Sequence, residues 1–165
     1  MASSELEIRA REDANLNSIV ADFANPLGDG TDGSVWPTNR KTAVKALQRQ
    51  RNYRCERDCY QRLKEHQITV IDGLAVPRLV SHDDVLWIIE MDIVSPPFLL
   101  DFAKAYLDVP PDHTAEVIED WRQAQAELWE DRWPQVRSIL WQLERLGIYY
   151  QDPKPGNIMF ADWQK

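Results

Sequence analysis

The stretch YYQDPKPGNIMF, residues 149–160, decides how the rest of the chain is interpreted. It presents an acid, a base two positions later and a carboxamide five positions later, namely Asp152, Lys154 and Asn157. The prolines and the glycine between them prevent helix or sheet from absorbing the segment, and apolar residues on both sides anchor it. Polar side chains on an irregular but anchored loop are typical of binding and catalytic sites.

The 165-residue chain has the composition of an ordinary globular protein, with 44% hydrophobic and 28% charged residues. Its formal net charge of −8 argues against nonspecific binding to nucleic acid or to an anionic membrane. No apolar run approaches the roughly 20 residues that a membrane-spanning helix needs, and no apolar signal segment is visible. We therefore expect a cytoplasmic protein that binds neither nucleic acid nor membrane.

The spacing of the cysteines and histidines in the sequence does not indicate a metal site. Cys55 and Cys59 lie one turn apart on a predicted helix, a spacing that suits neither a disulfide nor, without further ligands, a zinc site. The three histidines are scattered. We expect two reduced, partly buried thiols.

A second polar turn carries three glycines, Gly28, Gly30 and Gly33, in the spacing GxGxxG. Such glycines leave backbone N–H groups free to approach a phosphate. In a dinucleotide-binding unit the motif must open a helix, but proline and asparagine follow here, and residues 42–47 then read as a strand. The loop is therefore expected to join two strands, the first at residues 19–23, and a plain hairpin turn is the alternative.

A lysine interrupts the apolar strand predicted at residues 42–47. Because side chains alternate along a strand, Lys45 faces away from its neighbours, beneath the glycine loop. A helix is predicted at residues 53–66, and Glu56 lies on its inward stripe. A buried acid usually has a basic partner, so Lys45 is expected to pair with Glu56. Glu65 is the second choice, and a solvated lysine and acid are the alternatives.

Two more strands, predicted at residues 75–80 and 85–91, would complete a five-stranded antiparallel sheet. A Ser-Pro-Pro breaker at residues 95–97 ends this region, and the pattern that follows is helical. We therefore predict an α+β chain with a leader at residues 1–15, an N-terminal lobe at 16–94 and a reduced helical C-terminal lobe at 95–165.

Three helices are predicted in the C-terminal lobe, at residues 98–107, 114–131 and 134–147. Thr114 is the expected N-cap of the second helix. The third helix starts at a proline, ends at a glycine and delivers the chain into the loop of residues 149–160. Its apolar face needs a cover, either the second helix or a second copy of the chain.

Four motifs occur here in the order that they have in the protein kinase superfamily. They are the glycine motif, the Ala-Val-Lys strand at residues 43–45, the inward acid Glu56 and the DxKPxN loop at 152–157. The chain resembles that family from about Ile19 to Phe160. The DxKPxN form is similar to the serine/threonine branch. The resemblance implies a two-lobed protein-kinase-like fold with ATP and Mg²⁺ as cofactors.

The resemblance also implies roles for residues on both sides of a cleft. On the phosphate side, Gly28, Gly30 and Gly33 would cover the phosphates, and Lys45, fixed by Glu56, would bind the α- and β-phosphates. On the base side, Val35 would lie against the adenine with Ala43 in the same site. Ile89 would be the gatekeeper, and the backbone of Glu90 and Asp92 would bind the adenine edge. For the reaction, the implied residues are Asp152 as acceptor of the hydroxyl proton, Lys154 at the γ-phosphate and Asn157 as a Mg²⁺ ligand.

The chain departs from the family pattern in three places, one of which is Pro153 in the place of the usual leucine. Tyr150-Gln151 stand where the family has His-Arg, so an aromatic ring is expected in the place of the histidine, and the arginine that receives an activation-loop phosphate is absent. No Asp-Phe-Gly motif follows Asn157, so we expect a chain truncated before that motif and without its main Mg²⁺ carboxylate. The short link after Asn157 makes Asp162 a poor substitute.

Three hypotheses follow. The first is an ATP-binding kinase-like domain that transfers the γ-phosphate of ATP to a hydroxyl of a Ser/Thr side chain or of a small molecule. The alternative is a catalytically inactive, pseudokinase-type module that binds nucleotide or protein. The third is a structural scaffold with the same fold, which would need a cleft filled by side chains. The retained glycines and Lys45 favour nucleotide binding over turnover. The expected partners are a nucleotide and either a protein substrate or a second copy that docks through the C-terminal helices.

Overall fold

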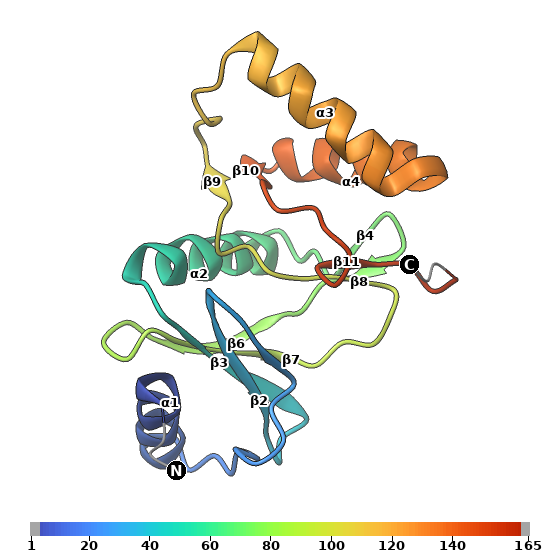
Figure 1. Cartoon of the computed structure of the whole chain (residues 1–165). Helices are drawn as coiled ribbons and strands as arrows, with labels where there is room; N and C mark the ends of the chain where they lie inside the picture. Colours follow the sequence, from blue (N-terminus) through green and yellow to red (C-terminus); the bar gives the residue numbers. More distant parts are fainter. Residues whose placement is uncertain (1–3, 163–165) are drawn as a thin grey trace.

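The computed structural model describes residues 4–162, which form a mixed α+β arrangement around a five-stranded antiparallel sheet (Figure 1). This confirms the predicted α+β class and the predicted sheet. The strand order is β1-β2-β3-β7-β6. The strands are β1 (Gly28–Asp29), β2 (Gly33–Pro37), β3 (Thr42–Leu47), β6 (Leu79–Asp83) and β7 (Ile88–Asp92).

Helix α1 (Glu5–Leu16) covers one face of this sheet, where the sequence predicts only a leader. Ala10 and Ala14 are buried against the sheet in a cluster with Val44 and Ile88. Small side chains four residues apart let the helix lie close to the strands, which explains why its inward stripe is hardly visible in a hydropathy pattern. The first three residues of the predicted leader lie outside the described residues.

Helix α2 (Gln50–Glu65) covers the opposite face and matches the predicted helix, with a start three residues earlier. Its buried stripe includes Glu56, Cys59 and Tyr60. Both cysteines are free, and burial raises the pKa of each thiol. The sheet is thus enclosed between α1 and α2, as Figure 1 shows.

Three strand predictions differ from the structure. Within residues 19–23 only Ala21 forms a bridge, to Thr38, because the Asp22 side chain accepts from the following backbone N–H groups and forms a turn. The strand predicted at 75–80 is divided by Pro77, which has no N–H to donate. The strand predicted at 85–91 begins only at Ile88, because Asp83 accepts from two backbone N–H groups of a turn at residues 84–87.

A second sheet, of order β11-β8-β5-β4, joins segments far apart in the sequence. Its strands are β4 (Val70–Ile71), β5 (Leu74–Ala75), β8 (Phe98–Leu99) and β11 (Ile158–Met159). The predicted domain boundary between residues 94 and 95 stays a prediction, and this sheet takes strands from both sides of it.

The helix predicted at residues 98–107 is wrong. The segment forms β8, a turn and β9 (Tyr106–Leu107), which pairs with β10 (Ile148–Tyr149). Asp101 within it and Asp108 directly after it have positive φ angles of 64° and 63°, a conformation that a helix excludes.

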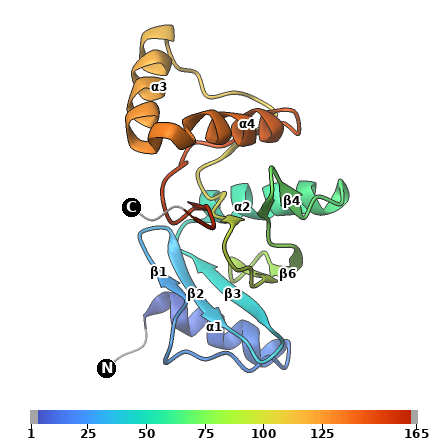
Figure 2. The same cartoon turned by 90° about the vertical axis from the view of Figure 1, so that its right-hand side faces the viewer.

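The remaining helices are α3 (Ala115–Trp129), a 3-10 turn η1 (Glu130–Arg132) and α4 (Trp133–Glu144), which confirm the two predicted helices. Thr114 caps α3 by accepting from the N–H of Val117 at 3.3 Å. The two helices pack together through the rings of Trp121 and Trp133, so α3 partly covers α4 (Figure 2).

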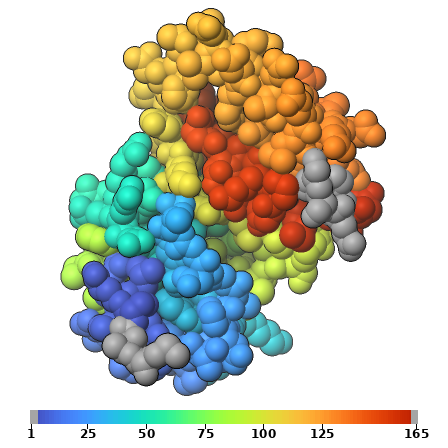
Figure 3. Space-filling view, viewed as in Figure 1, coloured from blue at the N-terminus to red at the C-terminus, as the bar shows by residue number. Residues whose placement is uncertain are grey.

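Figure 3 shows the red segment after α4 lying between the orange helices and the blue to green strands. The last three residues of the predicted C-terminal lobe lie outside the described part of the chain. Among residues 4–162, no helix is both long and apolar enough to cross a membrane.

Candidate functional site

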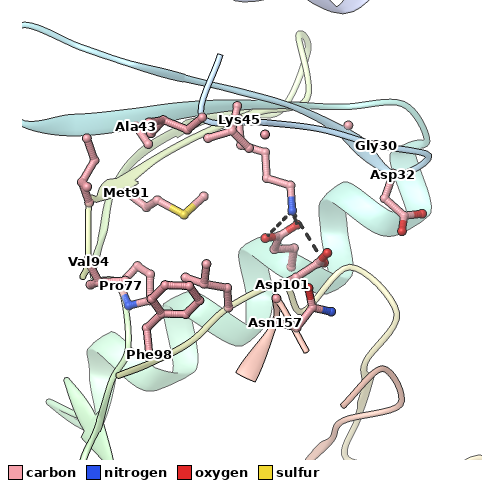
Figure 4. Close-up of a pocket in the computed structure, with 18 of the residues that line it drawn as sticks. Gly30, Asp32, Ala43, Lys45, Pro77, Met91, Val94, Phe98, Asp101 and Asn157 are labelled. Atoms are coloured by element: carbon pink, nitrogen blue, oxygen red, sulfur yellow. Dashed lines mark hydrogen bonds and ion pairs between the residues drawn. The ribbon is translucent and has the colours of Figure 1, made fainter. Parts of the chain in front are cut away.

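A cavity of about 550 Å³ lies beneath β1–β3 and is bordered by α2, by the segment after β7 and by the loop before β11 (Figure 4). This volume is within the range of small-molecule sites. One end is apolar and the other carries charged and amide groups. The apolar lining includes Leu27, Val35, Ala43, Pro77, Met91 and Phe98, and the polar lining includes Asp32, Lys45, Glu56, Asp101, Lys154 and Asn157.

The glycine motif forms the turn of the β1–β2 hairpin over this cavity, and all three of its glycines line it. A Cβ at Gly33 would lie 2.2 Å from the carbonyl oxygen of Ala46, so the close approach of β2 to β3 requires glycine there. A Cβ at Gly28 or Gly30 would meet no atom within 4 Å. The backbone of those two residues therefore borders open space.

Lys45 and Glu56 form a buried ion pair at the polar end. The Nζ atom of Lys45 lies 2.9 Å from Oε1 and 2.7 Å from Oε2 of Glu56. Burial alone would lower the pKa of Lys45, but the carboxylates of Glu56 and Asp101 outweigh it and hold that pKa above its ordinary value. Burial raises the pKa of Glu56 to about 7, against the lowering effect of Lys45. The pair presents a fixed ammonium group to the cavity.

Asp101 is a site residue that the sequence analysis missed. Its Oδ1 atom lies 3.6 Å from Nζ of Lys45, and its side chain lines the cavity. The segment carrying it was expected to be a helix, on which Asp101 would have had no relation to the site. The apolar run Phe98–Leu100 that ends in an aspartate is the signal that could have located it, because such a run suits a short buried strand.

The loop of residues 149–160 brings its three polar side chains together. Asp152 Oδ2 lies 2.9 Å from Nζ of Lys154, and the amide of Asn157 donates to the backbone oxygen of Asp152 at 3.1 Å and to Oδ2 at 3.3 Å. Lys154 and Asn157 line the cavity. Lys104, also missed by the sequence analysis, lies 3.8 Å from Asp152 and 3.1 Å from Asp32 in the glycine turn.

Two aromatic residues hold this loop in place. The hydroxyl of Tyr150 donates to the carbonyl of Leu100 at 2.6 Å, and its ring packs edge-on against Phe102. The ring thus lies in the interior, as expected for an aromatic in the place of the family's histidine. From α3, the indole N–H of Trp129 donates to the carbonyl of Pro153 at 3.0 Å. The loop is irregular but rigidly anchored.

Ile89, the expected gatekeeper, is not among the residues that line the cavity. Ile89 is fully buried in the core, and Met91, two residues later on the same face of β7, reaches the cavity instead. The role of Ile89 was implied by the family resemblance alone. Because β7 extends to Asp92, Met91 lies nearer the end of the strand than Ile89 does.

The backbone groups expected to bind an adenine edge, those of Glu90 and Asp92, lie within strand β7. Glu90 is paired on both sides within the sheet, and the N–H of Asp92 donates to the carbonyl of Arg78. Ile93 and Val94 lie beyond the sheet and line the cavity. Within residues 4–162, none of the backbone hydrogen bonds uses the N–H groups of these two residues. They replace Glu90 and Asp92 as candidates.

The cavity lining is rich in acids, with Asp29, Asp32, Glu56, Asp92 and Asp101 against Lys45 and Lys154. In the described part of the chain, no group of three or more His, Cys, Asp or Glu side chains is arranged to hold a metal ion. The carboxylate of Asp101 and the amide of Asn157 nevertheless offer hard oxygen donors in one cavity, and Mg²⁺ uses few protein ligands when phosphates supply the rest. The donor set therefore fits Mg²⁺.

Comparisons with known proteins give few matches. No family model matches the chain, and no curated protein matches it. A solved structure with similarity to it is the ternary complex of streptomycin, ATP and APH(2")-IIa. That match has 15% sequence identity, covers 78% of this chain and has a TM-score of 0.40. The match covers 37% of that protein chain, and the streptomycin and ATP are bound to that protein.

Proposed function

We propose that this chain binds ATP in the cavity of Figure 4 and transfers the γ-phosphoryl group to a hydroxyl. The observation that carries the proposal is the buried Lys45–Glu56 ion pair, which opens onto the same cavity as the glycine turn and the loop of residues 149–160. Phosphoryl transfer depends on positioning and charge neutralisation, and such an arrangement supplies both.

The nucleotide would lie with its base at the apolar end. Val35 and Ala43 form the upper wall and Met91 the inner end, and the free N–H groups of Ile93 and Val94 would donate to the adenine edge. The triphosphate would then extend toward the ammonium group of Lys45. The open space over Gly28 and Gly30 leaves room for phosphate oxygens close to the backbone.

In the transfer step, the oxygen of the acceptor hydroxyl forms a bond to the γ-phosphorus while the bond from that phosphorus to the β–γ bridging oxygen breaks, and ADP leaves. Asp152 accepts the hydroxyl proton. Lys154, which lies 2.9 Å from Asp152, would neutralise the γ-phosphoryl oxygens. Mg²⁺ would neutralise further charge on the phosphates, with Asn157 as a ligand.

A nucleotide-binding module without turnover is the second candidate. It is favoured by the position of Asp152, the expected proton acceptor, which lies against Lys154 and Lys104 and, unlike Lys154 and Asn157, is not among the residues that line the cavity. The acceptor also stays a proposal, either a Ser/Thr side chain of a protein or a small hydroxyl compound. Docking of a second copy through α3 and α4 belongs to the same set of proposals.

Two variants test binding and turnover separately. Lys45→Met should weaken ATP binding by about tenfold or more in calorimetry, because it removes a buried charge-assisted contact to phosphate. Asp152→Asn should keep ATP affinity but lower phosphotransfer by about 100-fold or more. Lys64→Met, an exposed lysine of α2, is the control and should change neither.

The outcomes distinguish the two candidates. If the wild-type protein shows no ATP binding, both fail. If ATP binds and Lys45→Met weakens binding, but wild type and Asp152→Asn consume ATP at the same background rate, the nucleotide-binding module replaces the phosphotransferase. Acceptors to compare are a Ser/Thr peptide and a small polyhydroxyl compound.

A further inference from the structure

Strands β8 and β11 lie side by side at the floor of the cavity. They pair antiparallel, with Leu99 opposite Ile158 and Phe98 opposite Met159. Beyond the pair, the N–H of Leu100 donates to the carbonyl of Asn157 at 2.7 Å. Asp101 follows Leu100, two residues after the end of β8. The pairing therefore brings Asp101 and Asn157 together from opposite chain directions.

Both side chains are directed into the cavity. Figure 4 shows the Asp101 carboxylate next to the Asn157 side chain, with Lys45 on its other side. Asn157 is only 8% exposed, and its amide nitrogen is used by Asp152, which leaves its carbonyl oxygen for another partner. Two oxygen donors thus meet at the end of the cavity where phosphates are proposed to lie.

Phe102, which follows Asp101, fixes this arrangement to the rest of the site. It is fully buried, and its ring makes edge contacts with Tyr60 of α2 at 5.1 Å and with Tyr150 at 5.3 Å between centroids. Tyr60 lies one helical turn after Glu56. The position of Asp101 is therefore coupled through one packed aromatic row to the Lys45–Glu56 pair and to the loop of residues 149–160.

The charges of the cavity point to a cation. Asp92 is paired with Arg78 and Glu56 with Lys45, but Asp101 only shares Lys45 at 3.6 Å. A triphosphate placed there would meet Asp101 at close range, and the like-charge repulsion would oppose binding unless a divalent cation lay between them. Carboxylate, amide oxygen and phosphate oxygens form the ligand set that Mg²⁺ and Mn²⁺ prefer.

We propose that Asp101 and Asn157 bind the divalent cation that accompanies the nucleotide. The sequence Asp101-Phe102-Ala103 would then do the work of the Asp-Phe-Gly motif of the kinase family, but from a place before the catalytic loop instead of after it. The position of this motif in the sequence does not decide the geometry, because the strand that pairs with β11 can come from a segment before or after it in the sequence. The inference rests on the proposed nucleotide binding.

Nucleotide affinity with and without metal tests the proposal. With EDTA present, wild type and Asp101→Asn should bind ATP within about twofold of each other, or the variant more tightly, because a negative charge is removed. Added Mg²⁺ should strengthen wild-type binding by about tenfold or more, and this gain should be lost in Asp101→Asn. Asp112→Asn, an exposed acid outside the cavity, is the matched control and should keep the gain.

A measurement on the wild-type protein alone covers the case in which the variant fails to fold. With a non-hydrolysable ATP analogue bound, Mn²⁺ should broaden the backbone amide NMR signals of Phe102 and Asn157 at concentrations that leave Glu127 of α3 unaffected. Broadening centred on the glycine turn instead, or an equal Mg²⁺ gain in Asp101→Asn, overturns the metal site while ATP binding in EDTA still supports the proposed function. No ATP binding in either condition overturns both.

Discussion

The two faces of the five-stranded sheet each bury an acid from a covering helix, and they treat it differently. On the face toward α2, Glu56 is fully buried and paired with Lys45 at 2.7 Å. On the face toward α1, Asp13 is 4% exposed, and its side chain receives an amide hydrogen bond from Asn17. Its charged neighbours on the sheet are the acids Asp83 and Glu90.

The difference distinguishes the α2 face, which borders the candidate site, from the α1 face, which supports the sheet from behind. A buried ion pair adds little to stability on balance, so its presence on the α2 face is explained by the ammonium group that it holds toward the cavity. On the α1 face, the sheet's own acid Glu90 accepts hydrogen bonds from the hydroxyl groups of Thr42 and Ser81 at 2.6 and 2.9 Å. Neither Asp13 nor Glu90 is among the residues that line the cavity, so both contribute to the packing of that face.

The largest expected effect comes from breaking the pair on the α2 face. Glu56→Gln removes the main counter-charge of buried Lys45 and should lower the free energy of unfolding by about 3 kcal/mol, measured by urea denaturation at pH 7. Glu65→Gln, an exposed acid near the end of the same helix, is the control and should change it by less than about 0.5 kcal/mol. A small loss in Glu56→Gln would mean that Asp101 alone can balance Lys45.

A smaller loss is expected when α1 is detached from its face. The guanidinium of Arg9 donates to the carbonyls of Leu86 at 2.8 Å and Leu47 at 2.9 Å, and it lies over the ring of Trp87. Arg9→Met should destabilise by about 2 kcal/mol in the same assay and leave ATP affinity unchanged. Arg54→Met, an exposed arginine of α2, serves for comparison. An equal loss of ATP affinity would show that the two faces are not independent.

The smallest expected effect is a gain in stability, and it depends on pH. Burial, together with the nearby charges of Asp83 and Glu90, raises the pKa of Asp13 to about 6. Because this is above the unfolded value of 3.8, the folded state holds the proton more tightly, so the contribution of Asp13 to stability is fully present below pH 3.8 and is lost as pH rises through about 6. Asp13→Asn should therefore be more stable than wild type at pH 8, by on the order of 1 kcal/mol.

Thermal melts at pH 4 and pH 8 check the sign. The difference in Tm between Asp13→Asn and wild type should nearly vanish at pH 4 and be positive at pH 8. Glu12→Gln changes the neighbouring, exposed acid of the same helix and should show no such dependence. A variant that is less stable at both values would mean that the ionised Asp13 is stabilised by Asn17 after all.

Sequence reasoning located those parts of the site that depend on local geometry. Strand alternation placed Lys45 toward α2, the helical period placed Glu56 on the inward stripe, and the glycine spacing located the hairpin turn. Each inference needed only a few consecutive residues. The contact between Lys45 and Glu56 is present at the distance of a direct ion pair.

The parts that failed depend on where distant segments pair. Ile89 and Met91 share one face of β7, and only the end of the strand decides which of them reaches the cavity. Asp101 was missed for a similar reason, because its position follows from the pairing of β8 with β11. Helix α1 escaped notice because the residues that it buries, Ala10 and Ala14, are small and give little periodic signal.

The pairing of β8 with β11 also has a consequence for how the chain is made. Synthesis proceeds from the N-terminus at about 5 to 20 residues per second, so Leu99 leaves the ribosome some seconds before Ile158. During that interval the five-stranded sheet and its two helices can form, but β8 has one edge without its neighbour. The floor of the cavity is therefore the last part to close, and a nascent chain stalled before Ile158 would expose an unpaired strand edge to other chains.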